Sequence, residues 1–144
     1  MRLLSVDADR APAPDVEVFM TGRVVHFEIP FDDKDRAKRF YSDVFHWQLD
    51  EMPGFDYVGI SSGPAGDDGM PSEPGYIGGG MTSREGTNTG TVITLESTDI
   101  DADLARVEAH GGAVLSGKTP IGEMGFAAYF NDSEGNVVGL WQNA

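Results

Sequence analysis

The stretch VVHFEIP at residues 24–30, followed by DDKDRAKRFYSDVF at residues 32–45, decides the fold. The first run alternates well enough to predict a strand, which ends at Pro30 because proline cannot donate to the ladder. The second run carries apolar residues at helical spacing, and Asp32 or Asp33 is placed to cap its first turn. The chain therefore begins its ordered pattern with a strand that leads into a capped helix.

The same unit occurs a second time further along the chain. The β-branched run GTVITLES at residues 90–97 precedes IDADLARVEAH at 100–110, and Asp99 is placed as the helix cap. Alignment of Asp33 with Asp99 superposes the two units without a gap. The runs that read as strands after each helix are 47–52, 55–61 and 76–81 in the first half, and 113–121, 125–131 and 136–142 in the second. Two β-α-β-β-β modules predict a duplicated α+β fold, in which a cupped mixed sheet surrounds a cleft.

Residues 1–21 differ from the rest of the chain, because they have mixed polarity and no sustained period. We interpret them as an N-terminal extension, followed by a first module over about 22–89 and a second over about 90–143. The opening residues lack a basic region followed by an apolar stretch, so no secretory signal is expected.

Composition narrows the classes of partner. A formal net charge of −14 over 144 residues would repel both nucleic acid and anionic membrane surfaces. No apolar run approaches the roughly 20 residues that span a bilayer. The absence of cysteine excludes disulfides and thiolate chemistry. We therefore expect a cytoplasmic protein that binds neither nucleic acid nor membranes.

Two long segments resemble a known family. HFEIPFDDKDRAKRFYSDVFHW and STDIDADLARVEAHGGAVLSGKTPIGEMGFAAYFNDSEGNVVGLWQ are similar to the two modules of the vicinal oxygen chelate superfamily, the glyoxalase, bleomycin-resistance and extradiol dioxygenase group. The resemblance covers about residues 22–142 and implies a glyoxalase-like domain over 22–143 that forms a homodimer. Members include metal-dependent isomerases, epimerases and dioxygenases, and also proteins that sequester antibiotics without catalysis.

The resemblance also implies where a metal would bind, on the first and last strands of each module. His26 occupies the first of these positions. By the alignment of Asp33 with Asp99 its counterpart is Val92, and the last-strand positions fall at Gly139 and within 78–80, none of which offers a ligand atom. A divalent transition metal usually needs three or more protein ligands. We therefore expect no cofactor, while a divalent metal held in part by His26 stays open as the alternative.

Several polar and aromatic residues are candidates for the site. His26 and Glu28 are candidates for an acid and a base, because they stand two residues apart on one strand and can share a face. Burial would raise the pKa of Glu28, although a single glutamate is more often exposed to water. The candidates for contact with a ligand are Thr94, Glu96, Glu123, Tyr129 and Trp141. Each has an ordinary structural interpretation as well, as core, strand edge or polar loop.

His46 stands where the family commonly has glycine, at the end of the first helix. A positive φ is expected there, which histidine adopts only with some strain. For function, three interpretations stay open, one of them a structural or regulatory domain with a vestigial pocket. The first is a metal-independent protein that binds a small organic molecule in its cleft. The second is an enzyme, a lyase, isomerase or dioxygenase, that uses a metal or His26 with Glu28.

Overall fold

The computed structural model describes residues 22–144, so the predicted N-terminal extension at 1–21 lies outside the described residues. The first module contains β1 (Val24–Phe31), α1 (Lys34–Phe45), β2 (Gln48–Glu51), β3 (Tyr57–Ser61) and β4 (Gly78–Ser83). The second contains β5 (Val92–Glu96), α2 (Ile100–Ala109), β6 (Ala113–Ile121), β7 (Gly125–Asn131) and β8 (Val137–Asn143). The predicted order of strands and helices is confirmed in both halves.

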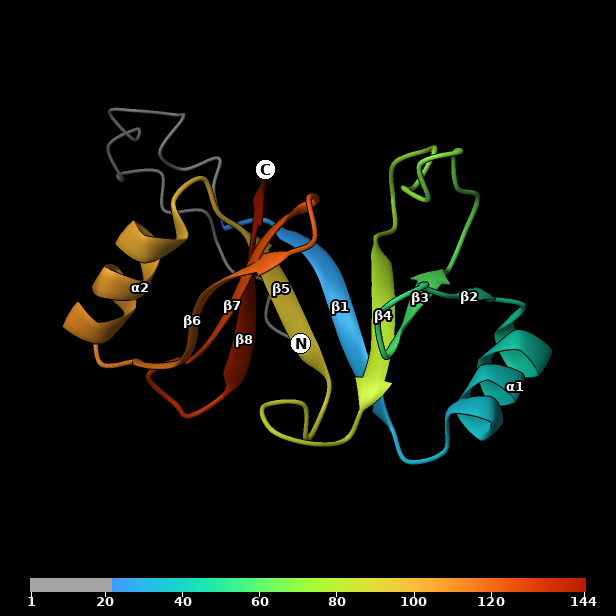
Figure 1. The fold of residues 1–144 in the computed structure, drawn as a ribbon, viewed down its shortest axis with the longest axis horizontal. Helices are drawn as coiled ribbons and strands as arrows, with labels where there is room; N and C mark the ends of the chain where they lie inside the picture. Colours follow the sequence, from blue (N-terminus) through green and yellow to red (C-terminus); the bar gives the residue numbers. More distant parts are fainter. Residues whose placement is uncertain (1–21) are drawn as a thin grey trace, which may run out of the picture.

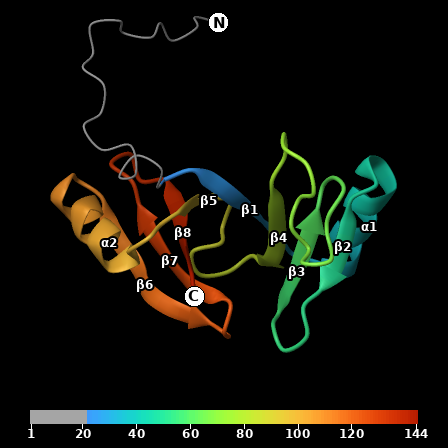
Figure 2. The same ribbon diagram turned by 90° about the horizontal axis from the view of Figure 1, so that it is seen from above.

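The strands form one mixed sheet in the order β2-β3-β4-β1-β5-β8-β7-β6. Its two halves join where β1 pairs with β5 in antiparallel fashion, while β1 pairs with β4 and β5 with β8 in parallel. The two halves slope away from β1 and β5, and α1 and α2 lie at opposite flanks (Figure 1). Seen from above, the sheet is an arch with its centre at β1 and β5 (Figure 2).

The pairing of β1 with β5 follows the duplication of the sequence. His26 lies opposite Thr94, and Glu28 lies opposite Val92. In the sequence alignment Val92 is the counterpart of His26 and Thr94 is the counterpart of Glu28, so equivalent residues pair crosswise. That pattern is the signature of a local two-fold relation between the modules. The side chains of His26, Glu28 and their counterparts therefore share one face at the centre of the sheet.

Helix ends behave as their residues predict. The side chain of Asp33 accepts a hydrogen bond from the backbone N–H of Arg36 at 2.9 Å, and Asp99 accepts one from Ala102 at 3.1 Å. Both are N-caps with extended backbone, and each satisfies a donor that the first turn leaves unpaired. His46 follows α1 with φ 60°, so the expected left-handed conformation at this position is confirmed.

The apolar core is divided between the modules and lies on the outer face of the arch. Under α2 it consists of Ile100, Leu104, Ala128, Phe130, Val138 and Leu140. Under α1 it consists of Phe31, Val58, Ile60 and Met81, with Ala37 and Tyr41 of the helix packed against them. Because the helices cover only the outer face, polar residues can gather on the inner one. No helix among residues 22–144 is long and apolar enough to cross a membrane.

Candidate functional site

A hydrogen bond between His26 and Tyr57 lies at the centre of the inner face. Nε2 of His26 on β1 is 2.6 Å from the hydroxyl of Tyr57 on β3, and both side chains are partly buried. The rings stack with an interplanar angle of 15° and a centroid separation of 6.3 Å. His26 therefore faces the protein and has one ring nitrogen already engaged.

Glu28 is the second member of this group, and it ties the two modules together. The hydroxyl of Tyr129, on β7, donates a hydrogen bond to Oε1 of Glu28 at 2.5 Å. Glu28 also interacts with the hydroxyl of Tyr57. Only 6% of Glu28 is exposed, so the water-exposed state that is usual for a single glutamate is wrong here. We call His26, Glu28, Tyr57 and Tyr129 the polar cluster.

Glycines in the neighbouring strands make room for the cluster. A Cβ atom at Gly80 would lie 1.9 Å from the hydroxyl oxygen of Tyr57, because the tyrosine side chain lies across this glycine. Gly80 is also the register partner of Glu28. On the other side, a Cβ at Gly139 would lie 2.9 Å from Oγ1 of Thr94 and 3.5 Å from Cε1 of Tyr129. A side chain at Gly80 would displace Tyr57, and one at Gly139 would press against Thr94.

The environment of the polar cluster favours uncharged side chains. Burial lowers the pKa of His26, so the imidazole stays neutral to lower pH than usual. Burial also raises the pKa of Glu28, and the hydrogen bonds from Tyr129 and Tyr57 offset that rise only in part. Desolvation, reinforced by the negative charge of Glu28, raises the pKa of both Tyr57 and Tyr129. Both phenols therefore keep their protons.

The remaining predicted site residues lie in different surroundings and do not all join the polar cluster. Thr94 is 6% exposed, faces His26 across the β1–β5 pairing and joins the inner face. Glu96 forms an ion pair with Arg23 at 3.5 Å. The indole N–H of Trp141 donates to Oδ1 of Asn143 at 2.8 Å, and register aligns Trp141 with Glu96 on the same face. Glu123 is exposed in the β6–β7 turn, and its side chain has no hydrogen bond or ion pair with residues 22–144.

Tyr57 is the site residue that the sequence analysis missed. It stands in FDYVGIS, a stretch that predicts a half-buried strand and nothing more specific. The glycine run in YIGGGM carried the available signal, since a strand glycine often marks a close approach by another group. That signal becomes specific only once β3 and β4 are known to pair.

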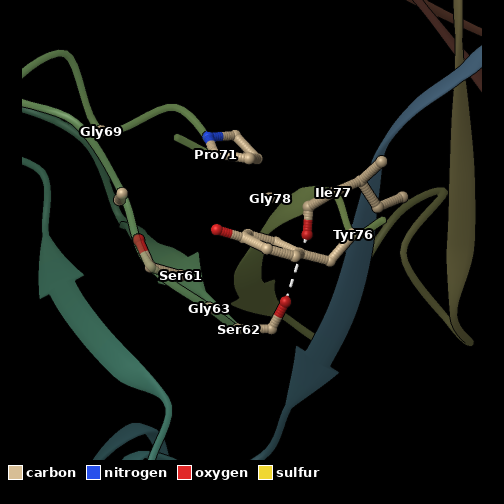
Figure 3. A pocket seen from close by; sticks show the side chains of 9 residues that line it. Ser61, Ser62, Gly63, Gly69, Pro71, Tyr76, Ile77 and Gly78 are labelled. Atoms are coloured by element: carbon tan, nitrogen blue, oxygen red, sulfur yellow. Dashed lines mark hydrogen bonds between the residues drawn. The ribbon is translucent and has the colours of Figure 1, made fainter. Parts of the chain in front are cut away.

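The surface of residues 22–144 has two hollows, of which one lies beside the polar cluster and the other lies away from it. The first is lined by Ser61, Gly78 and the loop between β3 and β4, and the ring of Tyr76 projects into it (Figure 3). This hollow adjoins the cluster, because Gly78 is the register partner of His26. The second, of about 290 Å³, lies between α1 and Arg84 on the outer side of the first module. The loop that carries Tyr76 therefore lines a hollow that reaches the register row of His26.

The residues present do not fit the metal site that the resemblance implied. Nε2 of His26 is engaged by Tyr57, and Oε1 of Glu28 is engaged by Tyr129. The counterpart position Val92 and the glycines of β4 and β8 supply no ligand atoms. Within residues 22–144, no group of three or more histidine or acidic side chains is placed to hold an ion. A restored ligand at Gly139 would also collide with Thr94.

Comparison with known proteins finds a family model and several relatives that match this chain. Residues 23–63 match the family model described as bleomycin resistance protein-like N-terminal. CFP32 of Mycobacterium tuberculosis, a glyoxylase by name, is 30% identical over 115 residues, which cover 76% of this chain. The match covers 41% of CFP32, so this chain spans about two fifths of that protein. A glyoxylase-like domain-containing protein of Didymella fabae is 30% identical over 122 residues, covering 81% of this chain and 90% of the relative.

Solved structures show the same architecture at low sequence identity. A glyoxalase/bleomycin resistance protein/dioxygenase superfamily member from Vibrio splendidus has a TM-score of 0.56 and 18% identity, with 86% of this chain and all of the other covered. A methylmalonyl-CoA epimerase of Streptomyces coelicolor has a TM-score of 0.60 and 18% identity, covering 86% and 99% of the two chains. The protein therefore belongs to the glyoxalase/bleomycin resistance/dioxygenase superfamily, the vicinal oxygen chelate superfamily.

Proposed function

We propose that this protein binds a small planar organic molecule on the inner face of its sheet, beside the polar cluster, and that it does so without a metal ion. The observation that carries the proposal is the mutual hydrogen bonding of His26 with Tyr57 and of Glu28 with Tyr129. Groups that satisfy one another in this way form a preorganised polar surface, but they leave no open set of ligand atoms for a cation.

Aromatic side chains support a planar ligand. Tyr57 and Tyr129 stand on either side of the central strands, and Trp141 on β8 lies two residues from Gly139, the register partner of Tyr129. Aromatic faces with a polar tip suit a ligand that is flat and carries few polar atoms. The hollow that the ring of Tyr76 fills adjoins the cluster, and such a ligand would enter it only where that ring moves aside.

The direct test is a binding titration with 4-nitroanisole, a flat neutral arene. Isothermal titration calorimetry would be done on the wild type with and without excess chelator, and on Tyr76→Ala, in which the occupied hollow is opened. We expect saturable binding that the chelator leaves unchanged and that Tyr76→Ala strengthens. Mass spectrometry should recover the probe unaltered. Absence of saturable binding, or binding that the chelator abolishes, would contradict the proposal.

A second function, acid–base catalysis, is favoured by one observation. The buried Glu28 has a raised pKa and lies in the same hydrogen-bonded group as a neutral imidazole. Pairs of titratable groups with shifted pKa values are typical of acid–base sites. A lyase or isomerase would use Glu28 and His26 to move a proton. Incubation with methylmalonyl-CoA in D2O tests the isomerase: deuterium incorporation at C2 that Glu28→Gln abolishes would establish proton transfer.

A further inference from the structure

Helix α1, at the flank of the first module, leaves large apolar side chains in contact with solvent (Figure 1). Phe40 is 54% exposed, Val44 is 52% exposed and Phe45 is 56% exposed. No residue of α1 is buried, whereas α2 buries Ile100 and Leu104. Neighbouring apolar side chains that stay exposed are typical of interaction sites.

The second module shows that these apolar side chains are not a requirement of the fold. In the alignment of Asp33 with Asp99, their counterparts on and after α2 are Arg106, His110 and Gly111. All three counterparts are exposed, as the three residues of α1 are. Two helices with equivalent places in a duplicated fold therefore differ in one respect, because only α1 presents aromatic and aliphatic groups to solvent.

Contacts between the rings hold this surface in place. Phe40 meets Tyr41 edge-on with 5.1 Å between the ring centroids, and Phe45 lies 6.2 Å from Trp47. Tyr41 stacks on Trp47 at 4.7 Å and with an interplanar angle of 8°. Side chains that are already ordered lose less conformational entropy when a partner covers them.

The hollow of about 290 Å³ runs along the same helix. Its apolar lining includes Phe31, Ala37, Phe40 and Tyr41, so Phe40 belongs both to the hollow and to the exposed surface. Helices pack by placing the side chains of one in the grooves beside the other. The hollow is therefore a place where a second helix could insert an apolar side chain.

Two arginines beside the hollow have no ion pair among residues 22–144. Arg84 pairs with Asp32 at 3.0 Å, and the carboxylate of Asp33 caps the helix. Arg36 and Arg39 are exposed and take part in none of the ion pairs of this part of the chain. Arginine and aromatic residues are enriched at the centres of protein interfaces. We call Arg36, Arg39, Phe40, Val44 and Phe45 the α1 surface.

We propose that the α1 surface is a docking site for an acidic amphipathic helix of another protein. The apolar side chains of that helix would enter the hollow and cover Phe40 and Val44, and its carboxylates would pair with Arg36 and Arg39. A second copy of this chain is a poorer occupant, because a two-fold contact centred on Phe40 would bring the flanking arginines of the two copies together. The site lies on the outer side of the first module and is separate from the polar cluster.

The length of α1 sets the probe. Its 12 residues span about 18 Å, so a blocked helical peptide of about 15 residues matches it. The peptide carries leucines at positions i, i+3, i+4 and i+7 and glutamates on its other face. Fluorescence anisotropy measures its binding to the full chain at about 0.15 M salt, where charges are screened beyond about 8 Å.

A second peptide, with lysine in place of each glutamate, makes the test specific. The net charge of −14 favours the lysine peptide through non-specific attraction. We nevertheless expect the glutamate peptide to bind about tenfold more tightly, since its carboxylates match the two arginines. A preference in that direction cannot arise from the overall charge of the protein.

Substitutions locate the contact. Phe40→Gln should weaken the glutamate peptide about tenfold or more, the effect of losing a central aromatic anchor. Phe55→Gln, which removes a 46% exposed ring from the β2–β3 turn, is the matched control and should bind like the wild type. The double variant Arg36→Gln, Arg39→Gln should lose about fivefold or more. Asp43→Asn removes an acidic group from the same helix and should increase the affinity.

The outcomes decide between occupants. Failure of the glutamate peptide to bind, equal or tighter binding of the lysine peptide, or a Phe40→Gln variant that binds like Phe55→Gln would each overturn the docking site. A dimer in sedimentation equilibrium that Phe40→Gln dissociates would assign the α1 surface to a second copy and would also overturn it. Circular dichroism checks that each variant is folded.

Discussion

The hydroxyl of Tyr57 lies 2.6 Å from Nε2 of His26, although 31 residues separate them in the chain. Tyr57 reaches β1 because β4, which lies between the two strands, carries Gly80 where the tyrosine crosses it. One contact thus joins the residue that the sequence singled out with one that it did not. The stability of this contact is open to direct measurement.

Removal of the Tyr57 hydroxyl should destabilise the protein. Tyr57→Phe leaves Nε2 of His26 without its partner inside a partly buried site, and such a loss costs about 1–3 kcal/mol. Urea unfolding followed by circular dichroism measures the change in free energy of unfolding. Tyr41→Phe is the control, because the hydroxyl of Tyr41 donates no hydrogen bond among residues 22–144. A loss in Tyr57→Phe no larger than in the control would contradict the assigned bond.

A side chain at Gly80 should conflict with Tyr57 specifically. The Cβ of Gly80→Ala would lie 1.9 Å from the hydroxyl oxygen of Tyr57, so the tyrosine must leave the cluster. We expect a loss of stability of about 1–3 kcal/mol, the range for overpacking a well-packed site. In the Tyr57→Ala background the same substitution should cost much less, because the clash is gone. Gly90→Ala, with open space around it, is the control. Additive effects of the two substitutions would show that the ring does not lie over Gly80.

Glu28 should make stability fall as the pH rises. Its folded pKa is above the ordinary value of 4.5, so between that value and the folded pKa the native state holds a proton that the unfolded state has lost. The free energy of unfolding therefore decreases through this window. His26 acts with the opposite sign, because its lowered pKa makes stability increase as the pH approaches 6.5 from below.

The contribution of Glu28 can be isolated by comparison with Glu28→Gln. As the pH rises above 4.5, the free energy of unfolding of the wild type should fall relative to that of Glu28→Gln, because glutamine does not titrate. Glu108→Gln, at an exposed position on α2, is the control. A difference that is flat with pH, or that shifts in favour of the wild type, would contradict a raised pKa.

Replacement of His46 should stabilise the first module. His46 has φ 60°, a conformation that places its Cβ close to the following carbonyl group. Glycine adopts it without strain, so His46→Gly should raise the free energy of unfolding by about 0.5–1 kcal/mol. His110→Gly, where α2 ends with φ −113°, should give no such gain. Equal effects at the two helix ends would refute the assignment.

Sequence reasoning reached the fold and named three residues of the polar cluster, His26, Glu28 and Tyr129, but not Tyr57. The caps at Asp33 and Asp99, the duplication and the shared face of His26 and Glu28 follow from local spacing, which is visible in one sequence. The hydrogen bonds that define the cluster are different, because Tyr129 and Glu28 are 101 residues apart and meet only through the pairing of β1, β5, β8 and β7. The burial of Glu28 has the same origin. The homodimer implied by the resemblance stays a prediction.

Metal analysis after reconstitution tests the central claim most directly. The purified wild type and His26→Ala would be stripped with chelator and dialysed against zinc, nickel, iron or manganese. After removal of excess ion, the metal content per chain would be measured by elemental mass spectrometry. Tyr57 and Tyr129 engage the atoms of His26 and Glu28 that a cation would need. We therefore expect the wild type to retain no more metal per chain than His26→Ala. One tightly held metal ion per chain in the wild type, absent from His26→Ala, would contradict it.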